Sequence, residues 1–302
     1  RRSLRESIGR QCIQRGKCIP AGKMSRMTRL SLAQVTLCAA DTRTPALAAL
    51  SLQRSMAGID FGRVVLFTDG WTPPHALPGI ELVQIPTLRS GADYSQFVLR
   101  ELQAHVHTSH VLVTQWDGFV LDAAAWTDEF LRCDYVGAVW PDERAGQAVG
   151  NGGFSLRSTR LLAAGMDPRI TETHPEDKVL CRDHRSLLET VHGVRFAPIE
   201  LARRFAFENE VPRGAQFGFH GPCNLPRVLT QGQLLDVMQQ LPDEFFRSRD
   251  ARRLARALLM HRMPAAARLL LQRRHAAGRS GINTRVLGWL ATGLGWWAPR
   301  AP

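Results

Sequence analysis

The segment VLVTQWDGFV, residues 111–120, places a carboxamide, Gln115, and a carboxylate, Asp117, directly after an apolar run that is typical of a buried strand. A carboxylate at such a strand end can bind a cation, but it can equally cap a turn or a helix. Gly118 beside it allows another group to approach the backbone closely, and it is also an ordinary turn residue. This segment alone therefore leaves binding and capping open.

A second segment, AVGNGGFSLRS over residues 148–158, places glycines around an asparagine immediately before an apolar stretch. Asn151, Gly152 and Gly153 remove side-chain bulk where the backbone passes close to another group, or they form a tight turn or bulge. No lysine follows the glycines and no helix opens on them, so the pattern matches neither a Walker loop nor a dinucleotide-binding loop.

Two further segments carry titratable groups. In HPEDKV, Glu176 and Asp177 fall in the first turn of a predicted helix that Pro175 precedes. Acids in that turn complement the helix dipole, and the alternative is that one carboxylate serves as a general base while backbone N–H groups hold the other. In QFGFHGP, His220 is either a loop histidine or a metal ligand, which would need a neutral ring and a carboxylate partner.

The elements that must position these residues follow from hydrophobic patterning. Apolar segments at 30–40, 63–70, 80–86 and 110–118 predict buried strands, and the periodicity at 44–56 and 93–106 predicts helices. This order predicts a mostly parallel α/β sheet with helices on both faces. Ligands bind such sheets at the carboxyl ends of the strands, where Asp41, Asp69 and Asp117 fall.

The remaining chain predicts helices at 123–132, 175–193 and 199–210 and strands at 154–158 and 194–198. From residue 229 onward the pattern is helical only. We therefore expect three parts: a basic, disordered segment over 1–29, an α/β domain over 30–228, and a basic helical extension over 229–302.

The net charge of +12 is unevenly distributed along the 302 residues. Residues 1–30 carry a net charge of +8 and residues 243–302 a net charge of +9, whereas the centre has 18 basic and 23 acidic residues. Basic ends of this kind solvate, contact an anionic membrane surface or dock a partner. Nucleic acid is disfavoured as a partner because no basic motif with interleaved aromatic residues occurs in the centre.

The chain carries no segment that predicts secretion or membrane insertion. Its six cysteines form no CxxC pair, which favours reduced thiols in a cytoplasm, and Met24 or Met27 is a plausible natural start. The apolar stretch at 286–299 either lies at a membrane interface or packs on the main domain. We therefore expect a cytoplasmic protein, with peripheral contact at the inner membrane face as an addition.

In chain order, the motifs DYVGAVWP, VGNGGFSLRS, PEDKVLC and FGFHG resemble those of a bacterial family of uncharacterised, glycosyltransferase-like proteins with the nucleotide-sugar-binding GT-A fold. The resemblance runs from about residue 35 to residue 224 and leaves both ends uncovered. It implies that Mn²⁺ or Mg²⁺ lies between the protein and the donor diphosphate, usually on an Asp-x-Asp motif after a central strand. Gln115 replaces the first acid here, Asp117 retains the second, and His220 resembles a late histidine ligand of many such enzymes.

The resemblance also implies roles for the other residues. The adjacent acids resemble the pair that serves inverting enzymes of this kind, so Asp177 or Glu176 is the expected base. The donor and acceptor are expected to contact a larger set of residues: Thr36, Asp41, Asp69, Tyr94, Gln115, Asn151, Gly152 and Gly153.

The sequence thus predicts a metal-dependent, GT-A-like glycosyltransferase that moves a sugar from a nucleotide-sugar donor to a glycan or lipid-linked hydroxyl acceptor, in cell-envelope or polysaccharide biosynthesis. One alternative is a nucleotide-sugar-binding protein without turnover, which Gln115 motivates. Another is a membrane-surface or nucleic-acid adaptor that acts through the Arg-rich ends. The adaptor would lose its function without residues 1–26 and 243–302, whereas the enzyme is expected to keep donor binding.

Overall fold

The computed structural model describes residues 29–279 and Leu287. The predicted N-terminal segment, with both candidate start methionines, therefore lies outside the described residues except for Arg29. The apolar stretch at 286–299 also lies outside them except for Leu287.

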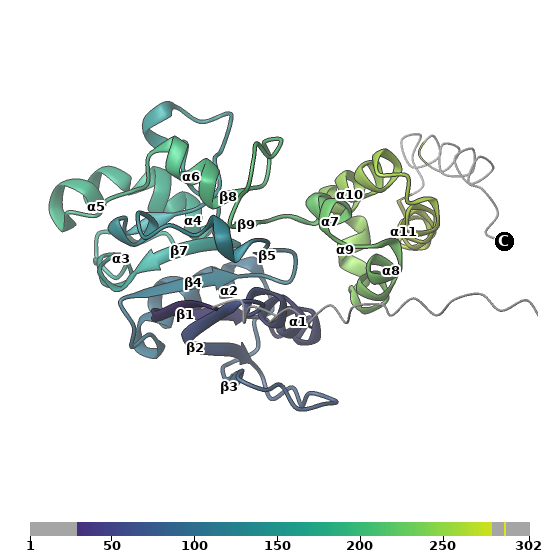
Figure 1. Ribbon diagram of the computed structural model, residues 1–302, viewed down its shortest axis with the longest axis horizontal. Coiled ribbons are helices and arrows are strands. Elements are labelled where there is room, and N and C mark those ends of the chain that lie inside the picture. Colours follow the sequence, from purple (N-terminus) through teal and green to yellow (C-terminus); the bar gives the residue numbers. More distant parts are fainter. Residues whose placement is uncertain (1–28, 280–286, 288–302) are drawn as a thin grey trace, which may run out of the picture.

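A six-stranded sheet forms the centre of the protein, with the order β3-β2-β1-β4-β7-β6 (Figure 1). The first four strands in this order are mutually parallel, and β7 runs antiparallel to both of its neighbours. The sheet strands are β1 (Leu30–Ala40), β2 (Ile59–Thr68), β3 (Glu81–Gln84), β4 (His110–Thr114), β6 (Tyr135–Val136) and β7 (Phe154–Ser158). This arrangement confirms the predicted α/β class with a mainly parallel sheet, and it is consistent with a GT-A-like fold.

Helices cover both faces of this sheet. Neighbouring residues of a strand point to opposite faces, so each strand contributes side chains to both layers of packing. Leu37 of β1 packs in one apolar cluster with Leu52 of α1 (Pro45–Ser55). The next residue, Cys38, packs in a different cluster with Phe97 of α2 (Gly91–Arg100). The continuous apolar strands detected in the sequence are thus buried on both sides.

Strand pairing at one edge brings distant segments together. Thr114 at the end of β4 pairs with Phe154 at the start of β7, so the glycine loop before β7 lies beside residues 115–118. A second, small sheet has the order β5-β9-β8, made of β5 (Phe119–Val120), β9 (Gly218–Phe219) and β8 (Ala206–Phe207). Because Phe119 pairs with Phe219, the residue after β9 lies beside the end of the Gln115–Gly118 turn.

The C-terminal helices gather to one side of the sheet (Figure 1). They are α7 (Leu225–Val228), α8 (Gln231–Gln240), α9 (Asp243–Arg247), α10 (Arg249–Met260) and α11 (Pro264–Ala276). Their apolar cluster also contains Leu47 of α1, Phe119 of β5 and Phe219 of β9. The helical extension therefore shares a core with the α/β part.

Several predicted elements differ from the structure. The helix predicted at 123–132 is wrong: the chain forms two 3₁₀ turns, Ala123–Ala125 and Phe130–Arg132. Trp126 between them is extended and packs its ring on Phe130 and Phe217, with ring centroids 5.3 and 5.0 Å apart. The strand predicted at 194–198 contributes only an isolated bridge, between Phe196 and Tyr135.

The helices predicted at 175–193 and 199–210 are also shorter than expected. The first divides into α4 (Glu176–Lys178), a π-helical turn (Val179–Asp183) and α5 (Arg185–His192). The second ends early, as α6 (Ile199–Phe205), because the chain passes directly into β8. The remaining short elements are α3 (Thr159–Ala164) and 3₁₀ turns at Leu102–His105, Ala145–Gln147 and Pro222–Asn224.

No helix within the described ranges is long and apolar enough to cross a bilayer. Cys38, Cys133, Cys181 and Cys223 are free thiols.

Two methionines of the helical extension differ in burial, and substituting each of them tests how the extension packs. Met238 of α8 is fully buried, whereas Met260 at the end of α10 is 77% exposed. We expect Met238→Ala to lower the free energy of unfolding by about 2–5 kcal/mol, because it leaves a cavity in the core that the extension shares with β5 and β9. Met260→Ala should change it by less than about 0.5 kcal/mol. Urea titration followed by circular dichroism measures both, and equal effects would contradict the shared core.

Candidate active site

Two neighbouring cavities lie at the carboxyl ends of the parallel strands. The first, which we name the carboxylate cavity, has a volume of about 340 Å³. It brings together eight of the residues singled out in the sequence: Tyr94, Gln115, Asn151, Gly152, Gly153, Glu176, Asp177 and His220. Both cavities lie within the size range typical of ligand pockets.

Glu176 forms a buried ion pair with Arg157. Its Oε1 lies 3.0 Å from Nη2 of Arg157, which is fully buried in β7, and Glu176 is itself only 5% exposed. Arg157 also donates to Ser155 Oγ and to the carbonyl of Gly152, at 2.9 and 3.3 Å. A buried guanidinium needs such a counterion, so Glu176 has a structural partner that occupies its charge.

Asp177, the next residue, is in a different environment. Among the described residues, its carboxylate accepts from backbone N–H groups alone, those of Gly152 at 3.2 Å and Lys178 at 2.8 Å. Burial, followed by repulsion from Glu176, raises its pKa above the ordinary value. Two adjacent carboxylates thus differ in role: Glu176 neutralises Arg157, and Asp177 is the one poised to take up a proton.

His220 lies between two carboxylates. Its Nε2 is 3.3 Å from Asp117 Oδ1 and its Nδ1 is 3.3 Å from Glu208 Oε1. Gln115 Oε1 also lies 3.2 Å from Nε2. Burial opposes the charged ring, but Asp117 and Glu208 outweigh it and raise the pKa of His220 well above its ordinary value.

The glycine loop makes room for these side chains. A Cβ on Gly152 would collide with Glu176 Oε1, and a Cβ on Gly153 would collide with the imidazole of His220. Asn151 between the flanking glycines adopts a positive φ of 72°, and its Oδ1 accepts from the N–H of Gly153 at 3.1 Å. The sequence predicts that another group approaches the backbone closely at these glycines, and the groups that do so are the side chains of Glu176 and His220.

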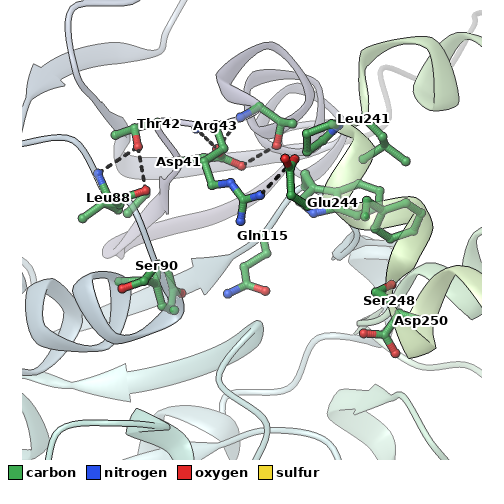
Figure 2. Close-up of a pocket in the computed structure, with 17 residues that line it drawn as sticks. Asp41, Thr42, Arg43, Leu88, Ser90, Gln115, Leu241, Glu244, Ser248 and Asp250 are labelled. Atoms are coloured by element: carbon green, nitrogen blue, oxygen red, sulfur yellow. Dashed lines mark hydrogen bonds and ion pairs between the residues drawn. The ribbon is translucent and has the colours of Figure 1, made fainter. Parts of the chain in front are cut away.

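The second cavity, which we name the interface cavity, has a volume of about 370 Å³ and lies between the strand ends and the α8–α10 segment (Figure 2). Gly91, Tyr94 and Gln115 line both cavities, so the two cavities adjoin at these residues. The Tyr94 hydroxyl is buried without a hydrogen-bond partner, and burial raises its pKa.

Asp41, Thr36 and Asp69 lie outside the carboxylate cavity. Asp41 lines the interface cavity, where its carboxylate accepts from the backbone of residues 43 and 44 and from the Thr44 hydroxyl. Thr36 is buried within β1, with its Oγ1 2.8 Å from that of Thr108, and lines neither cavity. Asp69 accepts from the Thr87 hydroxyl at 2.7 Å and also lines neither.

Sequence reasoning missed three contributors. Arg157 could have been noticed as the one charge in the apolar segment FSLRS. Glu208 was hidden because it falls within the helix predicted at 199–210, whereas the helix ends at Phe205. The sequence of residues 241–250 contains no pattern that predicts a place at the site. These residues approach strand ends that lie more than 120 residues earlier in the chain.

The predicted metal ligands Asp117 and His220 are adjacent but do not complete a site. Asp117 Oδ1 is buried, accepts no hydrogen bond from the described residues and lies 3.3 Å from His220 Nε2, so a cation could bind this oxygen if it replaced the proton of the ring. Across residues 29–279 and Leu287, however, no three His, Cys, Asp or Glu side chains are grouped to hold a metal ion. The donor set therefore fits Mn²⁺ or Mg²⁺ only if substrate oxygens and water supply the other ligands.

The buried ion pair generates a stability prediction. We expect Glu176→Gln to lower the free energy of unfolding by about 3–5 kcal/mol, because it leaves Arg157 charged and uncompensated. Glu189→Gln, which removes the partly exposed partner of Arg185, is the matched control and should cost less than about 1 kcal/mol. Urea titration measures both. A cost for Glu176→Gln as small as that of the control would contradict the role assigned to the pair.

Comparison with known proteins gives a limited match. Residues 79–220 match a family described as "Protein of unknown function (DUF5672)". No curated protein matches the chain. Among solved structures, one similar chain is glucosyl-3-phosphoglycerate synthase from Mycobacterium tuberculosis, in complex with Mn²⁺, uridine diphosphate and glucosyl-3-phosphoglycerate. It is 11% identical, with a TM-score of 0.31, and the match covers 43% of this chain and 58% of the synthase.

Proposed function

We propose that the protein is a glycosyltransferase that moves a sugar from a nucleotide-sugar donor to a hydroxyl acceptor. The observation that carries this proposal is the pair of adjoining cavities at the strand ends, one of which presents Asp177 with a raised pKa. A donor of this kind has two parts joined by a diphosphate, and two compartments that meet at Tyr94 and Gln115 suit such a ligand.

Asp177 is the proposed general base. Transfer to a hydroxyl requires removal of its proton as the new glycosidic bond forms, and a carboxylate with a raised pKa accepts a proton more readily than an ordinary one. The two backbone N–H donors fix the orientation of its carboxylate. Asn151, Gly152 and Gly153 line the same cavity and would contact the sugar or acceptor.

Asp117 and His220 are the proposed protein ligands of a divalent cation, Mn²⁺ or Mg²⁺. When bound, such a cation would neutralise the charge that develops on the departing diphosphate. His220 must lose its proton to coordinate, so cation binding would release one proton from the site. Gln115, which lies beside His220 and lines both cavities, would contact the donor.

The acceptor is proposed to be a glycan or a lipid-linked sugar. The charge of the C-terminal helices supports a location at an anionic membrane surface. Arg249, Arg256 and Arg268 are exposed, and in the described ranges no carboxylate lies within ion-pair distance of them. Such arginines attract anionic lipid, where a lipid-linked acceptor would be presented.

The assignment of Asp177 predicts a loss of turnover. We expect Asp177→Asn to reduce the release of nucleoside diphosphate from UDP-, GDP- or dTDP-sugars with Mn²⁺ by about 100-fold or more, because the variant cannot take up the proton. Asp183→Asn is the matched control, since Asp183 is exposed in the following turn and paired with Arg182. Unchanged turnover in Asp177→Asn would contradict the proposal. Nucleotide binding without turnover in the wild type would favour the inactive binding protein instead.

The same variant should also gain stability. Because the pKa of Asp177 is raised on folding, the folded protein binds this proton more tightly than the unfolded chain does. The ionised carboxylate therefore opposes folding above the folded-state pKa, and this penalty disappears below the unfolded pKa of about 3.9. Urea titration at pH 7 should show Asp177→Asn more stable than the wild type. The difference should vanish in acid, and a less stable variant at pH 7 would contradict the raised pKa.

A further inference from the structure

The helical extension forms one wall of the interface cavity. Leu241, Glu244, Phe245, Ser248 and Asp250 line it from the α8–α10 segment. In Figure 2 the labelled Leu241, Glu244, Ser248 and Asp250 lie across from Asp41, Thr42, Arg43 and Gln115. The segment lies beyond residues 79–220, so the matched family region does not include it.

The charge of this cavity disfavours phosphate. Three carboxylates line it, from Asp41, Glu244 and Asp250, against the single cation Arg43. Arg43 Nη2 itself lies 3.9 Å from Glu244 Oε2. A net negative lining repels an anionic group but accepts hydrogen bonds from the hydroxyls of a neutral one.

The same cavity has an aromatic and aliphatic side. The ring of Phe245 from the extension packs edge to face on Trp116, with centroids 5.6 Å apart. Leu88 and Leu241 add aliphatic surface to the lining. A flat ring with attached hydroxyls, as in a nucleoside, suits an apolar wall next to carboxylates.

The carboxylate cavity has complementary features. It contains Lys178 and His220 together with three carboxylates, of Glu176, Asp177 and Glu208. Arg157 neutralises Glu176, so the two remaining acids are matched by Lys178 and the protonated ring of His220. An anionic diphosphate is therefore better accommodated at the junction of the two cavities, next to His220, than deeper in the interface cavity.

We propose that the interface cavity binds the nucleoside end of the donor, and that Phe245 and Asp250 of the helical extension contact the base and the ribose. This inference rests on the proposed function and assigns the two ends of its donor. The sequence predicts that donor binding survives the loss of residues 243–302. The inference predicts instead that this loss impairs donor binding, because it removes one wall of the site.

Calorimetric titration of the full chain with UDP, GDP and dTDP in the presence of Mn²⁺ tests this assignment. For the nucleotide that the wild type binds, Phe245→Ala should raise the dissociation constant at least about fivefold, through loss of an aromatic contact with the base. Asp250→Ala should raise it at least about threefold, through loss of a hydrogen bond. Binding of inorganic pyrophosphate with Mn²⁺ should stay unchanged in both variants, because it occupies only the junction.

Asp243→Ala is the matched control, since Asp243 lies in the same segment, is exposed and does not line the cavity. If Phe245→Ala lowers the melting temperature, Phe245→Leu replaces it in this test, because leucine keeps the apolar packing but removes the aromatic ring. Wild-type affinity in Phe245→Ala, Phe245→Leu and Asp250→Ala would overturn this inference and leave the proposed function standing. Equal losses in Asp243→Ala and Asp250→Ala would overturn it as well. Failure of the wild type to bind any of the three nucleotides would overturn the proposed function and the inference together.

Discussion

The buried pair between Arg157 and Glu176 organises the site. Arg157 is fully buried in the antiparallel strand β7, and its charge must be neutralised inside the protein. Glu176 approaches it across the glycine loop, which is possible because Gly152 has no side chain at the point of contact. With Glu176 committed in this way, Asp177 is left with backbone donors only and a raised pKa. One ion pair thus separates two adjacent acids into a structural group and a group that can exchange a proton.

A similar balance of charge holds at His220. The pairing of β5 with β9 brings the ring beside Asp117, and Glu208 approaches its other nitrogen. The cluster therefore has two carboxylates and one imidazole, and the neutral Gln115 contacts the ring without adding a further negative charge. In the proposed function, a bound cation would take the place of the ring proton.

The sequence predicted the sheet well because its strands are buried on both faces and read as continuous apolar segments. It also identified eight residues that one cavity collects, since polar groups after buried strands and glycines before them mark the same sheet edge. Failures arose where tertiary contacts overrode local pattern: Trp126 packs on Phe217 instead of continuing a helix. Glu208 was missed because the helix predicted at 199–210 ends at Phe205 and β8 carries the chain toward His220. Residues 241–250 could not be assigned because long-range packing alone places them at the site.

We propose that Asp117, with His220, supports cation-dependent donor binding next to Asp177. The most direct measurement is the melting temperature of the wild type and of Asp117→Ala with UDP-, GDP- and dTDP-sugars, each with and without Mn²⁺. We expect that at least one of these donors raises the melting temperature of the wild type only when Mn²⁺ is present, and that Asp117→Ala abolishes this increase. No increase with any of the donors, or an equal increase in Asp117→Ala, would contradict it.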